Sequence, residues 1–462
     1  MNAPTILHDV SRRAFLQRTA ALGIAGVAAP FATTLGAIGE AAAATATDYK
    51  ALVCVFLQGG NDHYNTLVPY DPSSHALYAA ARGSLALGRD ALQATALTGV
   101  DLGGRAYALA PAMAPLSPLF DTGRLAVALN VGTLIQPTTR AQYLNKSVRL
   151  PPKLFSHNDQ QSFFQASSPE GAVSGWGGRI GDLYQSGNGS ATMTCINASG
   201  NAVFLTGRQA IQYNVGTGGP VSLLRGGTSL YGSGLAATTL RQMMTDTNPH
   251  MFATEYARVN KRAIDTQAQL ANLLAGVPES QFSLFPSGNP LADQLRMVAR
   301  MIGISSELGV KRQVFFVSTG SFDLHDNLAT IQPTLLGRLA TAMRAFHDTT
   351  AALGVADKVT TFTGSDFGRT LASNGNGVDH GWGSMHFVMG GAVKGKRIYG
   401  TPPAIGHNTN DDVGQGRLIP TMSVDQYSST MARWFGVSDG DLTTVLPNIG
   451  NYDKSSWSQG FV

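Results

Sequence analysis

Aspartate and histidine side chains recur in this sequence where short apolar runs end or begin. Six of them could ligate a metal ion: Asp62, Asp323, His325, Asp366, Asp379 and His380. Mixed Asp and His ligands suit zinc or manganese, whereas oxygen ligands alone would suit calcium. Such an ion polarises a phosphoryl or sulfuryl ester and lowers the pKa of a bound nucleophile. These residues therefore indicate metal-assisted hydrolysis of an ester.

Each of these residues also has an ordinary structural interpretation. An Asp after a strand often forms a turn or caps a helix, and Asp326 is best explained as such a cap. A single His is more often a hydrogen-bonded surface or core residue than a ligand. Their joint occurrence at the ends of several strands is what favours a shared polar site.

A further reactive group is Ser156, which begins a segment expected to be helical as far as Gln165. Asp159 follows three residues later, so the pair fits a capping box in its acidic form. A helix N-terminus also favours an anion, and a hydroxyl beside a metal could attack a tetrahedral ester. His157 could protonate a leaving group, and Arg369 could bind a substrate anion or be an ordinary surface arginine. The spacing leaves these alternatives open.

The elements that must position these residues follow from the apolar pattern. Five apolar runs predict buried strands: residues 52–57, 125–131, 313–318, 358–363 and 387–389. Helical spacing predicts helices over residues 250–276, 291–307 and 334–353. Alternating strands and helices favour an α/β protein with a mostly parallel sheet covered by helices on both faces. Ligands of such sheets bind beyond the carboxyl ends of the strands, where the Asp and His residues occur.

The middle of the chain has a different composition. Residues 165–235 are rich in Gly, Ser, Thr and Asn and show no sustained period. We expect an irregular or β insertion or cap there, extending over about residues 165–250. Cys54 and Cys195 are the two cysteines; Cys54 lies inside an apolar run and is expected to be a buried thiol, and a disulfide between the two is the alternative left open.

The N-terminus predicts export by the twin-arginine pathway. Arg12 and Arg13 precede an apolar stretch over residues 20–38 and a run of small residues over 41–46. Residues 1–46 are therefore expected to be a cleaved signal peptide and residues 47–462 an exported domain, periplasmic or extracellular. No later segment holds about 18 consecutive apolar residues, so no transmembrane segment is expected in the mature protein. Basic residues are scattered at a net charge of +4, which argues against nucleic-acid binding.

Several longer motifs occur in the order typical of one family. They are LQGGND (57–62), LFSHNDQQ (154–161), GWGGR (175–179), FDLH (322–325), SDFGR (365–369), DHG (379–381) and GGAVKG (390–395). Through them the chain resembles the DUF1501 family of exported bacterial proteins over nearly all of the mature sequence. The resemblance implies a distant relation to the alkaline phosphatase and sulfatase superfamily. It thus implies a three-layer α/β/α sandwich, alkaline phosphatase-like, with an irregular insertion.

The resemblance also implies roles for individual residues. Five residues would hold the metal: Asp62, Asp323, His325, Asp366 and His380. Ser156 would take the position of the nucleophile. Phe367 stands where phosphatases of the superfamily have a histidine ligand, so one ligand of their pattern is missing. No Pro or Arg follows Ser156 as in sulfatases, which argues against a formylglycine sulfatase.

Two functions are compatible with these observations. The first is an exported metal-dependent hydrolase of phosphate or sulfate esters, with Ser156 or metal-bound hydroxide as nucleophile and a small molecule or glycan ester as substrate. The second is a non-catalytic envelope protein that keeps the scaffold and binds a glycan or a protein partner. The missing ligand and the Gly/Ser/Asn-rich segment are compatible with the second function.

Overall fold

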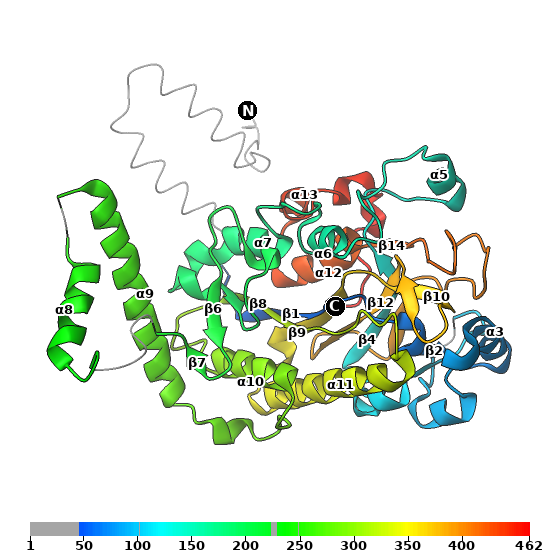
Figure 1. The fold of residues 1–462 in the computed structure, drawn as a ribbon, viewed down its shortest axis with the longest axis horizontal. Coiled ribbons are helices and arrows are strands. Elements are labelled where there is room, and N and C mark those ends of the chain that lie inside the picture. The colour runs from blue at the N-terminus through cyan, green and yellow to red at the C-terminus, as the bar shows by residue number, and fades with distance from the viewer. Residues whose placement is uncertain (1–45, 101, 223–228, 248) are drawn as a thin grey trace, which may run out of the picture.

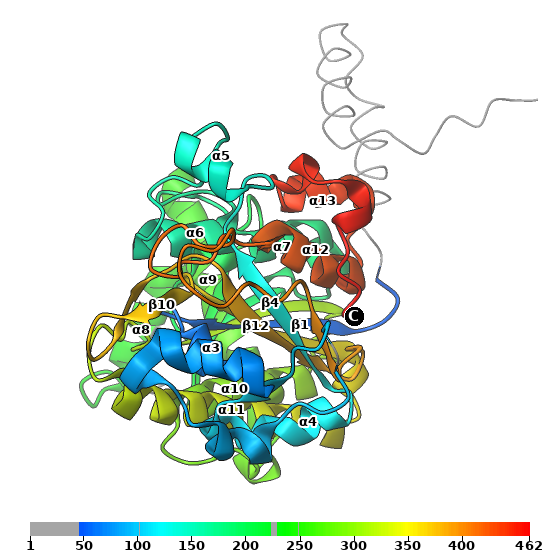
Figure 2. The same cartoon turned by 90° about the vertical axis from the view of Figure 1, so that its right-hand side faces the viewer.

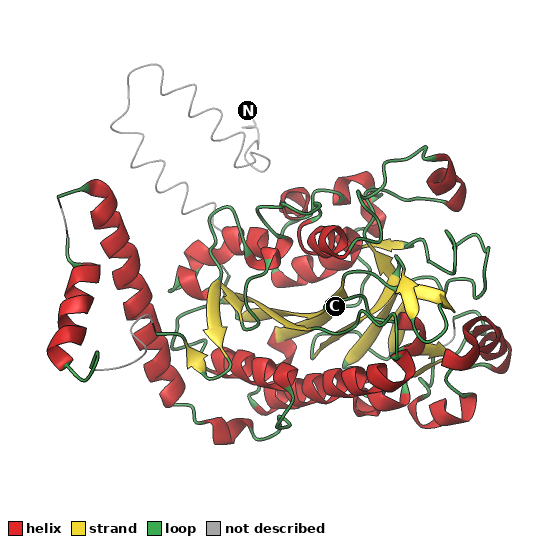
Figure 3. Cartoon of the chain, viewed as in Figure 1, coloured by secondary structure: helices red, strands yellow, loops and turns green. Residues whose placement is uncertain are grey.

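The computed structural model describes residues 46–100, 102–222, 229–247 and 249–462. The export signal predicted at residues 1–46 lies outside this part of the chain, apart from its last residue. The described residues form one sandwich with a sheet in its middle (Figures 1 and 3).

The central sheet has ten strands in the described chain, in the order β13-β4-β12-β9-β1-β8-β5-β6-β7, with β14 paired to β4. Their bounds are β1 (Lys50–Leu57), β4 (Leu125–Gly132), β5 (Cys195–Asn197), β6 (Tyr213–Gly216), β7 (Gly219–Pro220), β8 (Arg312–Thr319), β9 (Val359–Ser365), β12 (Ser384–Gly390), β13 (Arg397–Tyr399) and β14 (Met422–Ser423). β1 pairs in parallel with both β8 and β9, and its last residue Leu57 lies opposite Thr319 and Ser365. The ends of these three strands therefore meet at one edge of the sheet.

One of the five predicted strands runs in the opposite direction to the others. β12 is antiparallel to both of its neighbours, β4 and β9. The chain between β9 and β12 holds a short hairpin and no helix. A parallel return would need a longer crossover connection, so the short link fixes the antiparallel direction. The sheet as a whole remains mostly parallel.

Helices cover both faces of the sheet, as the sequence predicts (Figures 1 and 2). One face packs against α4 (Ser117–Asp121), α10 (Pro290–Gly303) and α11 (Leu328–Ala352), and the other against α6 (His157–Ala166), α7 (Trp176–Tyr184), α12 (Val424–Phe435) and α13 (Asp439–Val445). Side chains of β1 alternate between the two cores: Val53 and Val55 belong to the first, Leu52 and Phe56 to the second. This alternation is the period of a strand buried on both faces.

The remaining elements lie around this sandwich. They are β2 (Leu67–Pro69), α3 (Pro72–Arg82), β3 (Tyr107–Leu109), α5 (Arg140–Asn145), α8 (Gly234–Thr245), α9 (Met251–Ala275), β10 (Arg369–Ser373) and β11 (Val378–His380). The long helix expected over 250–276 is α9, which lies beside α8 at the flank of the molecule (Figure 1). No helix in the described ranges has the length and apolar content needed to cross a bilayer.

The Gly-rich middle segment contributes to the sandwich itself. Its strands β5, β6 and β7 extend the sheet beyond β8, and its helix α7 covers one face. Glycines permit this helix to pack closely, since a Cβ on Gly178 would lie 2.1 Å from the backbone of Thr206. Because glycines occupy several positions of α7, its sequence has no apolar period that would predict a helix.

Cys54 and Cys195 are free, buried thiols. They lie on β1 and β5, and β8 separates these two strands in the sheet. Burial raises the pKa of Cys195 to about 12, so this thiol stays protonated and unreactive near neutral pH.

Candidate metal centre

The candidate site lies at the edge of the sheet where β1, β8 and β9 end. The loop after β8 carries Asp323 and His325, and the residue after β9 is Asp366. α6 begins at His157 and points its N-terminal residue at the same edge, where His157 Nδ1 lies 2.7 Å from Asp366 Oδ2. Segments from three distant parts of the chain therefore meet here, and the β10–β11 hairpin, which closely follows Asp366, completes the site.

The hairpin brings His380 to the site. β10 and β11 are antiparallel, and Arg369 at the start of β10 lies opposite His380 at the end of β11. The turn between the strands is fixed by Asn374, whose amide donates to the carbonyl of His325 at 3.0 Å and to Asp379 Oδ1 at 3.1 Å. The hairpin and the loop after β8 are thus held together at the site.

The Nε2 atom of His380 lies close to the Nε2 atoms of both His157 and His325, and all three lie near the carboxylate of Asp323. His380 Nε2 lies 3.1 Å from His157 Nε2 and 2.9 Å from His325 Nε2. Asp323 lies 3.4 Å from His157 Nε2, 3.1 Å from His325 Nε2 and 3.4 Å from His380 Nε2. Ligand atoms about 2.0 Å from a tetrahedral zinc ion lie roughly 3.3 Å from each other. The separations among His157, Asp323 and His380 match this spacing, and His325 lies beside this group of three.

The other ring nitrogen of each histidine has an acceptor. Nδ1 of His157 binds Asp366 Oδ2 at 2.7 Å, and Nδ1 of His380 binds the carbonyl oxygen of Phe155 at 2.7 Å. Nδ1 of His325 lies 3.2 Å from Asp379 Oδ1. Carbonyl and carboxylate oxygens accept only, so each Nδ1 carries a proton. In the neutral form of such a ring the lone pair lies on Nε2, the atom that faces the cluster. Facing lone pairs repel one another unless a cation lies between them, and this donor set fits a zinc-type ion.

Charges within the site shift several pKa values. The hydrogen bond to Asp366 raises the pKa of His157, whereas burial lowers the pKa of His380. Burial alone would raise the pKa of Asp323, but the hydrogen bond and charge of Arg369 and the neighbouring histidines outweigh it and lower that pKa. Asp323 is therefore an anion at neutral pH, as a metal ligand must be.

Arg369 is an internal clamp at this site. Its side chain is fully buried, and its guanidinium donates to Asp323 Oδ1 at 2.5 Å, to the carbonyl of Gly60 at 2.8 Å and also to that of Gly59. A substrate anion would need these donors free and exposed. The structure thus corrects the expectation that Arg369 binds substrate: it holds the loops after β1 and β8 together.

Asp62, expected as a metal ligand, is engaged elsewhere. One of its oxygens forms a buried ion pair with Arg82 of α3, and the other accepts the backbone N–H of Tyr64 at 3.3 Å. It caps the short turn over His63–Asn65. Both oxygens are therefore used in structure, and Asp62 is not among the residues that the structure brings together with the histidines.

Ser156 is the N-cap residue of α6, directly before His157. Its hydroxyl donates to the side chain of Asp159 at 2.9 Å and makes no hydrogen bond to the backbone of the helix. The reciprocal capping box is thus absent here. The preceding residue, Phe155, has a φ of 72°, a strained value for a side chain of this size, and its carbonyl is the one that orients His380.

The structure sorts the remaining candidates into two groups. Asp323, His325 and His380 meet as predicted, and the ligating atoms of His157, Asp323 and His380 all lie within 4.8 Å of one another. Asp366 and Asp379 lie behind His157 and His325 as their hydrogen-bond partners. The sequence predicts a proton-donor role for His157, whereas its ring joins the cluster from the start of α6. The carbonyl of Phe155 gave no signal, because any residue supplies a carbonyl.

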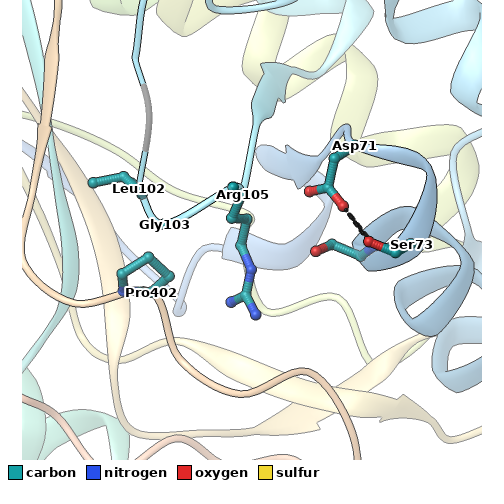
Figure 4. Close-up of a pocket in the computed structure, with 8 residues that line it drawn as sticks. Asp71, Ser73, Leu102, Gly103, Arg105 and Pro402 are labelled. Atoms are coloured by element: carbon teal, nitrogen blue, oxygen red, sulfur yellow. Dashed lines mark hydrogen bonds between the residues drawn. The ribbon is translucent and has the colours of Figure 1, made fainter.

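A hollow of about 270 Å³ lies apart from this centre, beside the start of α3 (Figure 4). Arg105 and Asp71 face it, but Asp71 already accepts hydrogen bonds from Ser73 and from the backbone of Ser74 at 2.7 and 2.8 Å. No histidine lines this hollow, and none of its lining residues belongs to the histidine cluster.

Fold and site together define a class of protein: a three-layer α/β sandwich with a candidate His/Asp metal centre at the carboxyl edge of its sheet. The chain belongs to the family described as "Protein of unknown function (DUF1501)", whose model matches residues 49–446. No curated protein matches the chain.

Proposed function

We propose that this protein is an exported metal-dependent hydrolase of phosphate or sulfate esters. The observation that carries the proposal is the convergence of three Nε2 atoms on Asp323 while all three Nδ1 atoms are bound to acceptors. Structural histidines seldom turn unsatisfied lone pairs toward each other, whereas metal-ligating histidines almost always have a carboxylate or carbonyl on the other nitrogen.

The proposed ligands are His157, Asp323 and His380, with His325 as the fourth. His157 supplies a third imidazole from α6, which compensates for the phenylalanine that follows Asp366 in place of a histidine. The donor set favours zinc or manganese over calcium. When bound, such an ion stabilises negative charge on the ester oxygens and activates an attacking oxygen nucleophile.

The chain's own groups would prepare the attack. Ser156 is the proposed nucleophile. Its hydroxyl donates a hydrogen bond to Asp159, which would hold the hydroxyl in place and make its deprotonation easier. Asp366, Asp379 and the carbonyl of Phe155 keep the histidine rings oriented. Arg369 keeps Asp323 ionised from the interior of the protein.

Two further parts of the proposal rest on the sequence. Twin-arginine export follows from the N-terminal motif, and an alkaline phosphatase-like origin of the sandwich follows from the family resemblance. The carboxyl-edge location of the cluster and the helix start beside it are compatible with that origin.

Elemental analysis and turnover assays test the proposal. The purified protein should contain near-stoichiometric zinc or manganese and should hydrolyse an aryl phosphate, a phosphodiester or an aryl sulfate in a chelator-sensitive manner. Asp323→Ala should lose both metal and turnover. Ser156→Ala should keep the metal and lose turnover by a factor of at least about 100, the usual effect of removing a catalytic group. Asp357→Ala, at an exposed site, is the matched control.

The outcomes separate the two candidate functions. Metal-free protein with an intact fold would contradict the metal centre. Bound metal without turnover of any of these esters would instead favour the non-catalytic binding protein. Turnover retained in Ser156→Ala would assign the attack to water rather than to the serine.

A further inference from the structure

A second hollow, of about 240 Å³, lies along α6, the helix that begins at His157. It lies between α6, the turn Val203–Leu205 and the end of the sheet at β1 and β8. Five of its ten lining residues carry side-chain amides: Gln58, Asn158, Gln161, Gln165 and Asn201. Its volume is below the roughly 300 Å³ at which pockets for drug-sized ligands begin, so it suits one small ring.

Two of the amides connect the hollow to the centre. Asn158 directly follows His157 on α6. Gln58 directly precedes Gly59, whose N–H donates to Asp366 at 3.1 Å, and the carbonyl of Gln58 accepts the N–H of Phe322 at 3.2 Å. The hollow is thus connected to the centre through Asn158, the chain neighbour of His157, and through Gly59, which binds the same carboxylate as His157 Nδ1.

Several of these amides have hydrogen-bonding capacity to spare. The side-chain amide of Gln161 has no hydrogen-bond partner among the described residues, and that of Asn158 makes only a long contact of 3.4 Å with Glu170. The side-chain oxygen of Asn201 accepts from Asn214, and that of Gln165 accepts from the N–H of Phe204. Within the described part of the chain, their NH₂ groups form no hydrogen bond. The hollow thus offers several donors and acceptors side by side.

The lining also shows what the hollow does not fit. None of its ten residues is Lys or Arg, and its one charged side chain is the carboxylate of Glu170. An anionic group would be repelled by this carboxylate, and the metal ion proposed for the histidine cluster would attract it instead. Phe316 is almost completely buried, which leaves Ala202 and Val203 as the aliphatic side chains of a mostly polar lining that suits an apolar peptide side chain poorly. Neutral hydroxyl groups, each both donor and acceptor, match such amides well.

We propose that this hollow binds the uncharged sugar ring of a glycan ester whose phosphate or sulfate group lies at the histidine cluster. The substrate part of this inference rests on the proposed function, while sugar binding itself does not. The amide-lined hollow selects the sugar, and the centre selects the anion.

Calorimetric titration of the full-length mature protein tests the sugar site without any turnover. The probes are cellobiose, lactose and chitobiose, with tetra-alanine as a peptide probe. At least one disaccharide should bind, and Gln161→Ala or Asn201→Ala should weaken it about fivefold or more, the effect of one lost hydrogen bond. Gln93→Ala, an exposed amide in another part of the molecule, is the matched control and should bind as the wild type does.

A second assay relates the sugar site to catalysis. For Gln161→Ala, the ratio of kcat/KM for a sugar 6-sulfate or 6-phosphate to that for the corresponding aryl ester should fall about fivefold. Disaccharide binding that both alanine variants leave unchanged, or binding of tetra-alanine alone, would overturn the sugar site. Sugar binding without any turnover would overturn the hydrolase and leave the sugar site standing. Aryl ester turnover without sugar binding would overturn the sugar site and leave the hydrolase standing.

Discussion

The two nitrogens of each clustered histidine have separate roles, and this division is the main feature at the scale of single residues. Asp366, Asp379 and the carbonyl of Phe155 fix the protonated Nδ1 atoms, which leaves the Nε2 atoms for a shared ligand. Such outer partners set the orientation and basicity of the inner ligands. The affinity of the centre should therefore depend on residues that never touch the ion.

Asp366→Asn tests this dependence. The substitution keeps an acceptor oxygen of similar size beside His157 Nδ1 but removes its negative charge, so the ring becomes a weaker ligand. We expect the affinity for zinc to fall roughly 10- to 100-fold without loss of the fold. Competition titration against a chromophoric chelator measures it, with Asp357→Asn as control. An unchanged affinity would show that His157 does not bind the ion through Nε2.

Two other histidines are buried in the core and make stability depend on pH. His63 and His386 are 7% and 1% exposed, and burial lowers the pKa of each to about 3. In the unfolded chain a histidine titrates near 6.5, so below that pH the unfolded state binds protons that the folded state does not. Their stabilising effect is thus complete above pH 6.5 and is lost as the pH falls toward 3.

His386→Phe should reduce this dependence. The ring contacts Phe164 and Tyr427, so phenylalanine fits the same aromatic surroundings. Between pH 6.5 and 4 the free energy of unfolding of the variant should fall less steeply than that of the wild type, by up to about 1.4 kcal/mol per pH unit. Urea unfolding at a series of pH values measures the slopes. His407→Phe, at an exposed position, is the matched control. Equal slopes for all three proteins would contradict the assignment.

At the scale of elements, the site depends on how closely the loop after β1 approaches the loop after β8. Gly59 has a φ of 109°, and a Cβ there would lie 2.5 Å from the backbone nitrogen of Asp323. Gly60 has a φ of 80°, and its carbonyl accepts a hydrogen bond from Arg369. Only glycine satisfies both the backbone angle and the contact at residue 59.

Gly59→Ala should therefore damage both the fold and the centre. The positive φ costs about 1–2 kcal/mol with a side chain, and the contact with Asp323 must be relieved by moving its loop. We expect a lower free energy of unfolding together with a lower metal content, measured by urea unfolding and elemental analysis. Gly354→Ala provides the comparison. Gly354 has a φ of 69°, but a Cβ there would contact nothing, so this substitution carries only the cost of the positive φ. Normal metal content in Gly59→Ala would show that the loops do not depend on this approach.

Some of these elements could be predicted from the sequence and others could not. The five strands and three helices were predictable because their apolar periods are strong, and the meeting of Asp323, His325 and His380 followed from the parallel strand ends. Asp62 has the same place after a strand, but whether it binds a metal depends on Arg82, which arrives from α3. The local sequence pattern also could not predict the direction of β12, because the short connection from β9 decides it. It could not predict α7, because the glycines of this helix pack closely and leave no apolar period.

At the scale of the whole molecule, the candidate ligands tie distant parts of the chain together. His157 comes from the start of α6, Asp323 and His325 from the loop after β8, and His380 from the β10–β11 hairpin. These segments belong to different layers of the sandwich. An ion bound to all of them would stabilise the folded state, because the unfolded chain does not hold its ligands together.

Metal removal should therefore destabilise the protein as a whole. For an ion at 1,000 times its Kd, the folded state gains about 4 kcal/mol over the metal-free protein. Treatment with EDTA should lower the thermal unfolding midpoint, and added zinc or manganese should restore it. Asp323→Ala removes the central carboxylate, so its midpoint should respond neither to chelator nor to metal. A wild-type midpoint that EDTA leaves unchanged, in protein shown by elemental analysis to have lost its metal, would mean that these segments are held together by their own packing and hydrogen bonds alone.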